Sequence, residues 1–303
     1  SEVFGELPPD YEAGYVDSLS NRSHSRTNGH NLDVGLNYSD DTWMFNASLG
    51  MTPQKRAIER KMGKLYADTT MHTIDFQPMI WVNWKKKEAR ITFNYSGRTR
   101  QPSLSDLMPL TDNSNPLYIT RGNPDLKQMF SHSVRVSFQH SKKGISANIG
   151  GQMEQNSVTQ VVLYDAKTGG RETSPINING NWNVYGSANW WKRLGHFSLR
   201  LDMNGNHSNR VSMINEDKSL EPKKSTTRDT GLGCDANVSY QPTWGGIDFS
   251  TSWNYQYSLN SINDNDTYTR NYSFRLEGYV DLPFGLQLRT DGAYSFRNGT
   301  NIR

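Results

Sequence analysis

The sequence from residue 182 to residue 203 reads WNVYGSANWWKRLGHFSLRLDM and contains the pattern that decides the fold. Apolar and polar residues alternate over 182–190, a charged turn follows at 192–195, and the alternation resumes over 197–203. A period of two places apolar side chains on one face of a β-strand and polar ones on the other. The stretch therefore predicts a two-stranded hairpin with aromatic residues beside its turn, as at the membrane interface of a transmembrane barrel.

The same unit recurs along the chain and predicts an all-β fold, an antiparallel up-and-down transmembrane β-barrel with about twelve strands in view. Pro78 interrupts the third strand, where we expect an edge or a bulge, because proline cannot donate to a sheet ladder. The expected strands cover residues 32–38, 43–51, 74–84, 89–95, 130–138, 145–153, 182–190, 197–203, 232–240, 247–257, 272–282 and 286–296.

The connections between these strands alternate in length, short after each odd strand and long and polar after each even one. Outer-membrane barrels show this asymmetry, with tight periplasmic turns and long extracellular loops. Trp and Phe residues gather beside the short turns, where an interfacial girdle belongs. The expected irregular segments are 1–28, 52–70, 97–127 with one helical turn at 107–110, 155–178 with strand extensions at 158–164, and 206–225.

Composition agrees with a membrane barrel better than with an ordinary soluble core. Of the 303 residues only 34% are hydrophobic, the mean hydropathy is −0.78, and yet 11% are aromatic, which is too many for a disordered chain. In a barrel only every second strand residue faces lipid, so a low mean hydropathy is expected. The net charge of +3 is well mixed and indicates no nucleic-acid partner. The single cysteine, Cys234, shares the apolar parity and is expected to pack or to face lipid.

A soluble sandwich or solenoid would also alternate, but strands of about a dozen residues exceed the usual sandwich strand of about 5–6. The sequence has no metal-protease, phosphate-loop, nucleophile-elbow or paired-cysteine motif, and its seven histidines are scattered. We therefore expect no enzymatic activity, no metal and no cofactor. A soluble β-type enzyme would need convergent acid and base residues that the sequence does not display.

The chain enters the first expected strand from the long-loop side and leaves the last expected strand on the same side. A barrel normally starts and ends on the periplasmic side. We therefore expect residues 1–303 to be a single, partial barrel region, with further strands before Ser1, after Arg303, or both. No plug domain is present in this sequence.

The 97–127 connection carries the most specific strings of the chain. They are YSGRTRQPSL at 95–104, LMPL at 107–110, NPLY at 115–118 and RGNPDL at 121–126. In order and spacing they resemble a segment of the barrel of TonB-dependent receptors and of the related outer-membrane β-barrel family of Bacteroidetes. The resemblance covers most of the chain and implies a complete barrel of about 22 strands.

The resemblance also implies a location in the bacterial outer membrane, in contact with membrane lipid, and a function. The first hypothesis is a receptor or transporter barrel that takes up a nutrient through its extracellular loops and lumen, with a plug domain and a TonB-type energy-coupling protein as partners. A surface lipoprotein is a further candidate partner. The second hypothesis is a structural barrel that belongs to a surface or secretion assembly and transports nothing.

Charged and amide side chains in the same connection are the candidate ligand contacts at the extracellular mouth. An alternative role is to hold the connection together by salt bridges and hydrogen bonds, which is the more ordinary use of such residues in loops. The prolines at 102, 109, 116 and 124 favour fixed turns in either case. The candidate residues are Arg98, Arg100, Asp106, Arg121, Asn123 and Asp125.

Overall fold

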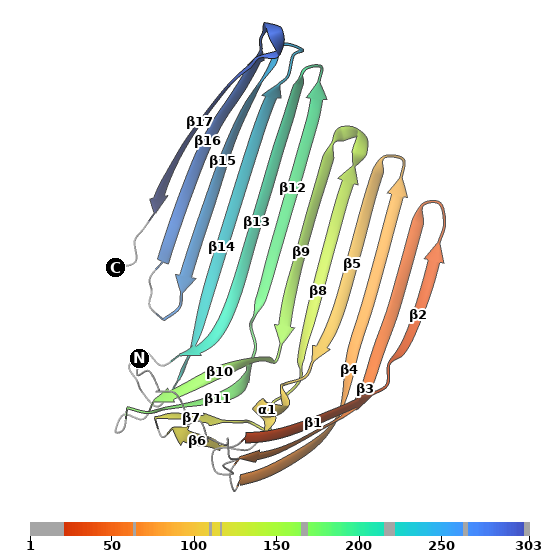
Figure 1. Ribbon diagram of the computed structural model, residues 1–303. Coiled ribbons are helices and arrows are strands. Elements are labelled where there is room, and N and C mark those ends of the chain that lie inside the picture. Colours follow the sequence, from red (N-terminus) through yellow and green to blue (C-terminus); the bar gives the residue numbers. More distant parts are fainter. Residues whose placement is uncertain are drawn as a thin grey trace, which may run out of the picture.

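The computed structural model describes residues 21–62, 65–108, 111–115, 117–164, 169–214, 222–262 and 266–299 of the chain. Most of them form one large antiparallel sheet of 13 strands (Figure 1). β1 and β2 pair with successive parts of β3, so they occupy one position, and the sheet has the twelve positions that the alternation predicts. In pairing order the strands are β1 (Asn21–Gly29) and β2 (Leu32–Ser39), β3 (Trp43–Met62), β4 (Leu65–Lys86), β5 (Ala89–Arg100), β8 (Met129–His140), β9 (Ile145–Gln155), β12 (Trp182–Leu194), β13 (Phe197–Ile214), β14 (Lys223–Tyr240), β15 (Gly245–Asn260), β16 (Asp266–Asp281) and β17 (Gln287–Gly299).

The register of the sheet keeps apolar residues beside apolar residues across the strand pairs. Leu36 lies opposite Ala47, and Cys234 lies between Met203 and Trp253 in one such row. A shift of one residue at any pair would move one strand's apolar set to the other face. The predicted alternation and the apolar placement of Cys234 are therefore confirmed.

The apolar face is largely exposed rather than packed into a core. Val34 is 75% exposed and Leu288 64%, whereas the most buried large apolar side chains, Leu107 and Met108, belong to a connection. An exposed apolar face of this extent is typical of a surface that lies against lipid. At the short turns the rings of Trp43 and Trp84 lie 6.5 Å apart, as expected for an interfacial girdle.

Pro78 does not place β4 at an edge. Its register with Leu49 of β3 is regular, but the pairing of β4 with β5 starts only at Met79. Beyond that point the side chain of Thr99 replaces the backbone ladder: its Oγ1 accepts a hydrogen bond from the Phe76 amide at 2.9 Å. The proline thus marks where β4 separates from β5, which agrees with its missing N–H.

Several expected loops are strands instead. β1 lies within the segment 1–28, of which residues 1–20 are outside the described part; β3 and β4 run through most of 52–70; and β13 and β14 continue into 206–225. These predictions were wrong for one physical reason. Beyond the membrane both faces of a strand meet water, so the backbone ladder continues while the alternation of hydropathy that reports it disappears.

A second, four-stranded sheet is built from two long connections. Its order is β10 (Ser157–Tyr164), β11 (Arg171–Ile178), β7 (Tyr118–Arg121) and β6 (Thr111–Asn115), with β11 and β7 parallel. The expected extension of a membrane strand at 158–164 is therefore a strand of this separate sheet. The helical turn lies earlier than the expected 107–110, at α1 (Leu104–Leu107), where the Ser103 side chain caps it by accepting a hydrogen bond from the Asp106 amide at 3.1 Å. Met108 is extended, and residues 109–110 lie outside the described part of the chain.

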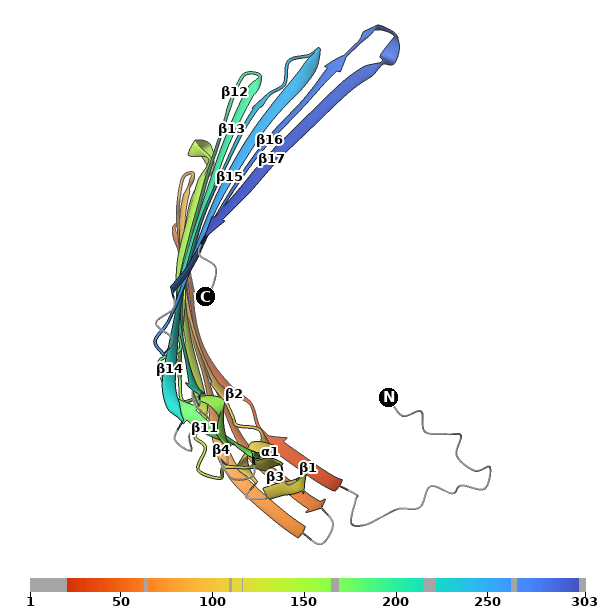
Figure 2. The ribbon, with the colours of Figure 1, turned by 90° about the vertical axis from the view of Figure 1, so that its left-hand side faces the viewer.

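The large sheet is bowed and open. Among the described strands, none joins β17 to β1 or β2, so these strands do not close into a barrel. Figure 2 shows the bow from the side, with α1 and the small sheet on its concave side, at the end away from the short turns. In the described residues no helix is long and apolar enough to cross a membrane.

Candidate ligand-binding groove

The face of the sheet opposite the apolar one, called the inner face below, receives the 97–127 connection. The Arg56 guanidinium donates a hydrogen bond to the Pro102 carbonyl at 3.1 Å. The Gln101 amide donates to the Asp75 carboxylate at 2.6 Å, and Asp75 also accepts from Gln54 at 2.9 Å. These contacts hold the start of the connection against the parts of β3 and β4 that extend past the apolar band.

Two of the predicted site residues hold the small sheet together. Arg121 of β7 forms a two-point contact with Glu172 of β11, with Nε–Oε1 at 3.0 Å and Nη2–Oε2 at 3.5 Å. The Asn123 side chain donates to the Pro175 carbonyl at 3.0 Å. Beside them the Arg171 guanidinium lies 4.7 Å from the centre of the Tyr118 ring. In this structure the side chains of Arg121 and Asn123 join the two connections to each other. This is the alternative to ligand contact that the sequence left open.

Asp106 and Asp125 lie in the same connection but line none of the cavities of the groove described below. The backbone carbonyl of Asp106 accepts a hydrogen bond from the Asn123 amide, and the Asp125 amide donates to the Asn123 side chain at 3.0 Å. The structure therefore gathers Asp106, Asn123 and Asp125 around one turn and separates them from Arg98 and Arg100.

Arg98 and Arg100 lie on β5 and line a cavity of about 240 Å³ on the inner face. Both side chains are exposed, and neither forms an ion pair or hydrogen bond with a residue in the described part of the chain. Residues of β8 and β9 also line the cavity. Its remaining lining residues are Ser96, Met129, Ser131, Ser133, Gln152 and Glu154.

Two further cavities adjoin this one. A cavity of about 290 Å³ shares Gln152 and Glu154 with it, and a third, of about 440 Å³, shares Ser208 and Arg210 with the second. Together the three form a continuous depression across the inner face from β5 to β16, which we call the polar groove. The second cavity is also lined by Asn181, Trp182, Asn183 and Asn209, and the third by Asn206, Asp229, Thr230, Gly231, Gln256, Tyr257, Ser258, Thr267, Tyr268 and Thr269.

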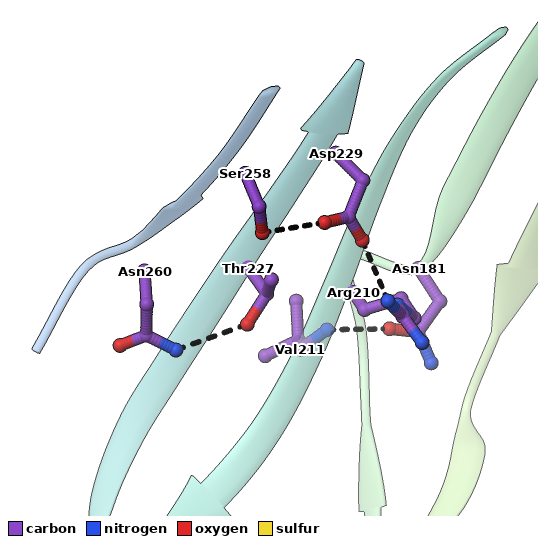
Figure 3. A network of polar contacts seen from close by, with 7 residues as sticks. All are labelled: Asn181, Arg210, Val211, Thr227, Asp229, Ser258 and Asn260. Atoms are coloured by element: carbon purple, nitrogen blue, oxygen red, sulfur yellow. Dashed lines mark hydrogen bonds and ion pairs between the residues drawn. The ribbon is translucent and has the colours of Figure 1, made fainter. Parts of the chain in front are cut away.

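A hydrogen-bond network fixes the widest part of the groove (Figure 3). Arg210 Nη2 lies 2.6 Å from Asp229 Oδ2, and the Ser258 hydroxyl donates to the other oxygen of Asp229 at 2.6 Å. Below them the Asn260 amide donates to Thr227 at 3.0 Å. The network therefore runs across β13, β14 and β15 and holds their side chains in fixed orientations.

The same contacts set the charge of Asp229, which lies beyond the last apolar residue of its strand. Partial burial raises the pKa of this carboxyl, but the hydrogen bonds from Ser258 and Arg210 and the positive charge of Arg210 outweigh it, so the pKa lies below its usual range. Asp229 is consequently ionised at neutral pH. The groove thus presents a balanced ion pair at its wide end and two unpaired guanidinium groups at its narrow end.

Sequence reasoning named only Arg98 and Arg100 among the groove residues. Arg210 fell in a segment expected to be a loop, and Asp229 and Ser258 carried no motif. The available signal was the register: once β13–β15 are paired, Arg210, Asp229 and Ser258 share the inner parity.

The lining of the groove is rich in groups that form hydrogen bonds. Its lining consists mainly of amide and hydroxyl side chains, which both donate and accept hydrogen bonds. Among the described residues no group of His, Cys, Asp and Glu side chains is arranged to hold a metal ion. Such a surface suits a polar ligand that is bound by many weak hydrogen bonds.

Comparison with a family model agrees with the architecture. A model described as the outer membrane protein beta-barrel family matches residues 36–227. A loop L8 deletion mutant of OmpT, an outer membrane protein of Vibrio cholerae, aligns at 8% identity over 92% of this chain and 94% of its own, with a TM-score of 0.29. In-vitro folded OmpT in its trimer form aligns at 7% identity over 92% and 89%, with a TM-score of 0.30. No curated protein matches the chain.

Proposed function

Since the chain belongs to the outer membrane protein beta-barrel family, and so lies in the bacterial outer membrane in contact with lipid, we propose that it is the wall of a receptor or transporter. It takes up a nutrient through its extracellular loops and lumen, with TonB-dependent energy coupling. In this proposal a plug domain and a TonB-type protein are its partners, and a surface lipoprotein is a further one. The protein binds and conducts its ligand without chemical conversion, so it is not an enzyme.

The observation that carries the proposal is the polar groove. It lies on the inner face, beyond the apolar band, so a solute arriving from outside meets it before the membrane-spanning part of the lumen. Its cavities measure about 240, 290 and 440 Å³, within or close to the range of about 300–1,000 Å³ usual for small-molecule sites.

Uptake by cells tests this function. Cells that lack the gene, complemented with the wild-type protein or with the Gln256→Ala/Asn206→Ala variant, are grown in a defined medium, and the depletion of polar solutes is followed. We expect one solute to be depleted by the wild type and several-fold more slowly by the variant, and an uncoupler of the membrane proton gradient to abolish the difference. The matched control is Asn94→Ala, an inner-face amide on β5 that is outside the groove.

If deletion of the gene leaves the depletion of every solute unchanged, the protein does not transport and the structural role in a surface or secretion assembly replaces the proposal. Depletion that persists with the uncoupler would contradict energy coupling and leave a passive channel. Surface display of each variant is measured by labelling intact cells, so that loss of assembly is separated from loss of uptake.

A further inference from the structure

We propose that the Arg98–Arg100 end of the polar groove is a subsite for an acidic group of the ligand, a carboxylate, sulfate or phosphate. This inference rests on the proposed function only in assigning that group to a transported ligand. The binding of the anion itself follows from the residues of the cavity and is measured separately.

The two arginines lie close together on one strand. Arg98 and Arg100 are two residues apart on β5, so both lie on the inner face, opposite Ser131 and Met129 of β8. Both line the same cavity. Two guanidinium groups held side by side repel each other, and an anion between them removes that repulsion and accepts hydrogen bonds from both. Most other arginines that face the inside of this sheet have a partner, as Arg210 and Arg275 do.

Neutral hydrogen-bond donors line the same cavity as the arginines. Ser96, Ser133 and Gln152 line the cavity with hydroxyl and amide groups. The Gln152 amide donates to Ser131 Oγ at 3.0 Å. This bond uses Ser131 as an acceptor and leaves its O–H free to donate to a bound group. A planar or tetrahedral oxyanion would therefore meet two charged donors and several neutral ones.

Glu154 is the acidic side chain among the described residues that line this cavity. Glu154 Oε2 accepts a hydrogen bond from the Ser157 hydroxyl at 2.8 Å, and Glu154 also lines the middle cavity. Its negative charge lies where the two cavities meet. An anionic group is consequently favoured on the Arg98 side and disfavoured at the junction, and this orients a ligand along the groove with its acidic end on β5.

The experiment measures anion binding by the purified chain in a neutral detergent. Inorganic sulfate, inorganic phosphate and acetate are titrated separately at constant ionic strength, and heats of binding are recorded. We expect saturable binding of at least one of the three. Arg98→Ala and Arg100→Ala should each weaken it about tenfold or more, the usual effect of removing one charged hydrogen-bonding partner. Glu154→Gln should strengthen it several-fold by removing a nearby negative charge.

Arg90→Ala is the matched control, because Arg90 is an exposed inner-face arginine on the same strand and outside the cavity. Binding that is unchanged in this variant supports the subsite. Equal weakening in Arg90→Ala would show that only overall charge matters and would overturn the proposal, as would the absence of saturable binding of all three anions. Arg98→Lys keeps the charge but loses the two-point geometry, so intermediate binding in this variant supports the site even if Arg98→Ala does not fold.

The three titrations separate the possible groups on the ligand. Binding of sulfate or phosphate without acetate assigns a tetrahedral oxyanion, and binding of acetate alone assigns a carboxylate. Anion binding that persists when cells show no uptake would overturn the proposed function and leave the subsite in place. Loss of anion binding alone, with uptake intact, would overturn the subsite and leave the proposed function.

Discussion

The carboxylate of Asp229 on β14 and the guanidinium of Arg210 on β13 lie 2.6 Å apart, on strands that are still paired well beyond the apolar band. Ser258 reaches the same carboxylate from β15. This ion pair and the hydrogen bond from Ser258 thus join three strands outside the membrane. Its strength depends on pH, because the pKa of Asp229 lies below its usual range.

The first prediction concerns how the stability that Asp229 contributes changes with pH. A carboxyl whose pKa is lower in the folded state stabilises the protein at all pH values above its unfolded pKa of about 3.9, and this stabilisation is lost as pH falls through the lower, folded pKa. We expect Asp229→Asn to lower stability at pH 7 by about 1 kcal/mol or less, since the pair is partly exposed, and to lower it progressively less as the pH falls below about 3.9. Thermal unfolding in detergent at a series of pH values from 7 downward is the measurement. A difference that grows on acidification would contradict this assignment.

The second prediction concerns Gly97, where a Cβ atom would lie 2.7 Å from both Pro78 and Phe130. Gly97→Ala should lower stability by about 1–3 kcal/mol, because the Pro78 ring is joined to its backbone and cannot move away without shifting β4. Gly292→Ala is the control, since a Cβ there meets no atom within 4 Å. The midpoints of urea unfolding in detergent are compared. Equal stability of the two variants would mean that the close contact at Gly97 is relieved without cost.

The third prediction concerns the lipid-facing side. Ile149 is exposed on the apolar face of β9, whereas Ser146 of the same strand has the opposite parity. Ile149→Arg should lower stability in lipid vesicles by about 2–4 kcal/mol, as for an arginine near the bilayer midplane, and Ser146→Arg should change it far less. Folding yields are read from the heat-modifiable shift on gels. Equal tolerance of both would place β9 outside the bilayer.

The fourth prediction concerns the link between Arg121 and Glu172. Arg121→Ala and Glu172→Ala should each speed amide exchange in β7 and β11, and the double variant should add little to either single one. We expect a coupling of about 0.2–1 kcal/mol, the range for exposed pairs, obtained from a double-mutant cycle. Arg193→Ala, at the turn end of β12 on the other side of the sheet from this contact, is the control. Additive effects of the two substitutions would indicate that the contact contributes nothing.

The membrane part of this fold was predictable because lipid and water impose different side chains on the two faces of each strand. All twelve expected strands are present, and the parity that placed Cys234 on the apolar face is confirmed. The strand β1 and the extensions of β3, β4, β13 and β14 escaped prediction because both of their faces meet water. For the same reason the groove could not be found from the sequence. Arg210 and Asp229 are 19 residues apart, and only the pairing of their strands brings them together.

The sequence could place a candidate site residue only where the residue lies next to a strand with a clear alternation. Arg98 follows directly on an alternating strand, so its face could be inferred, and it lies in the groove. Arg121 and Asn123 lie in a connection whose strands pair with another connection some 50 residues away. No local pattern reports such a pairing, so sequence alone could not separate a ligand contact from an internal one.

The parallel pairing of β7 with β11 also limits how this protein can change. The two connections that it joins link different hairpins, yet residues of each one form hydrogen bonds with the other. A shortened or exchanged loop at either position would remove the strand and the hydrogen-bond partners that the other loop pairs with. These two loops are therefore expected to be inherited and replaced together, and an engineer who moves one of them to another barrel must move both.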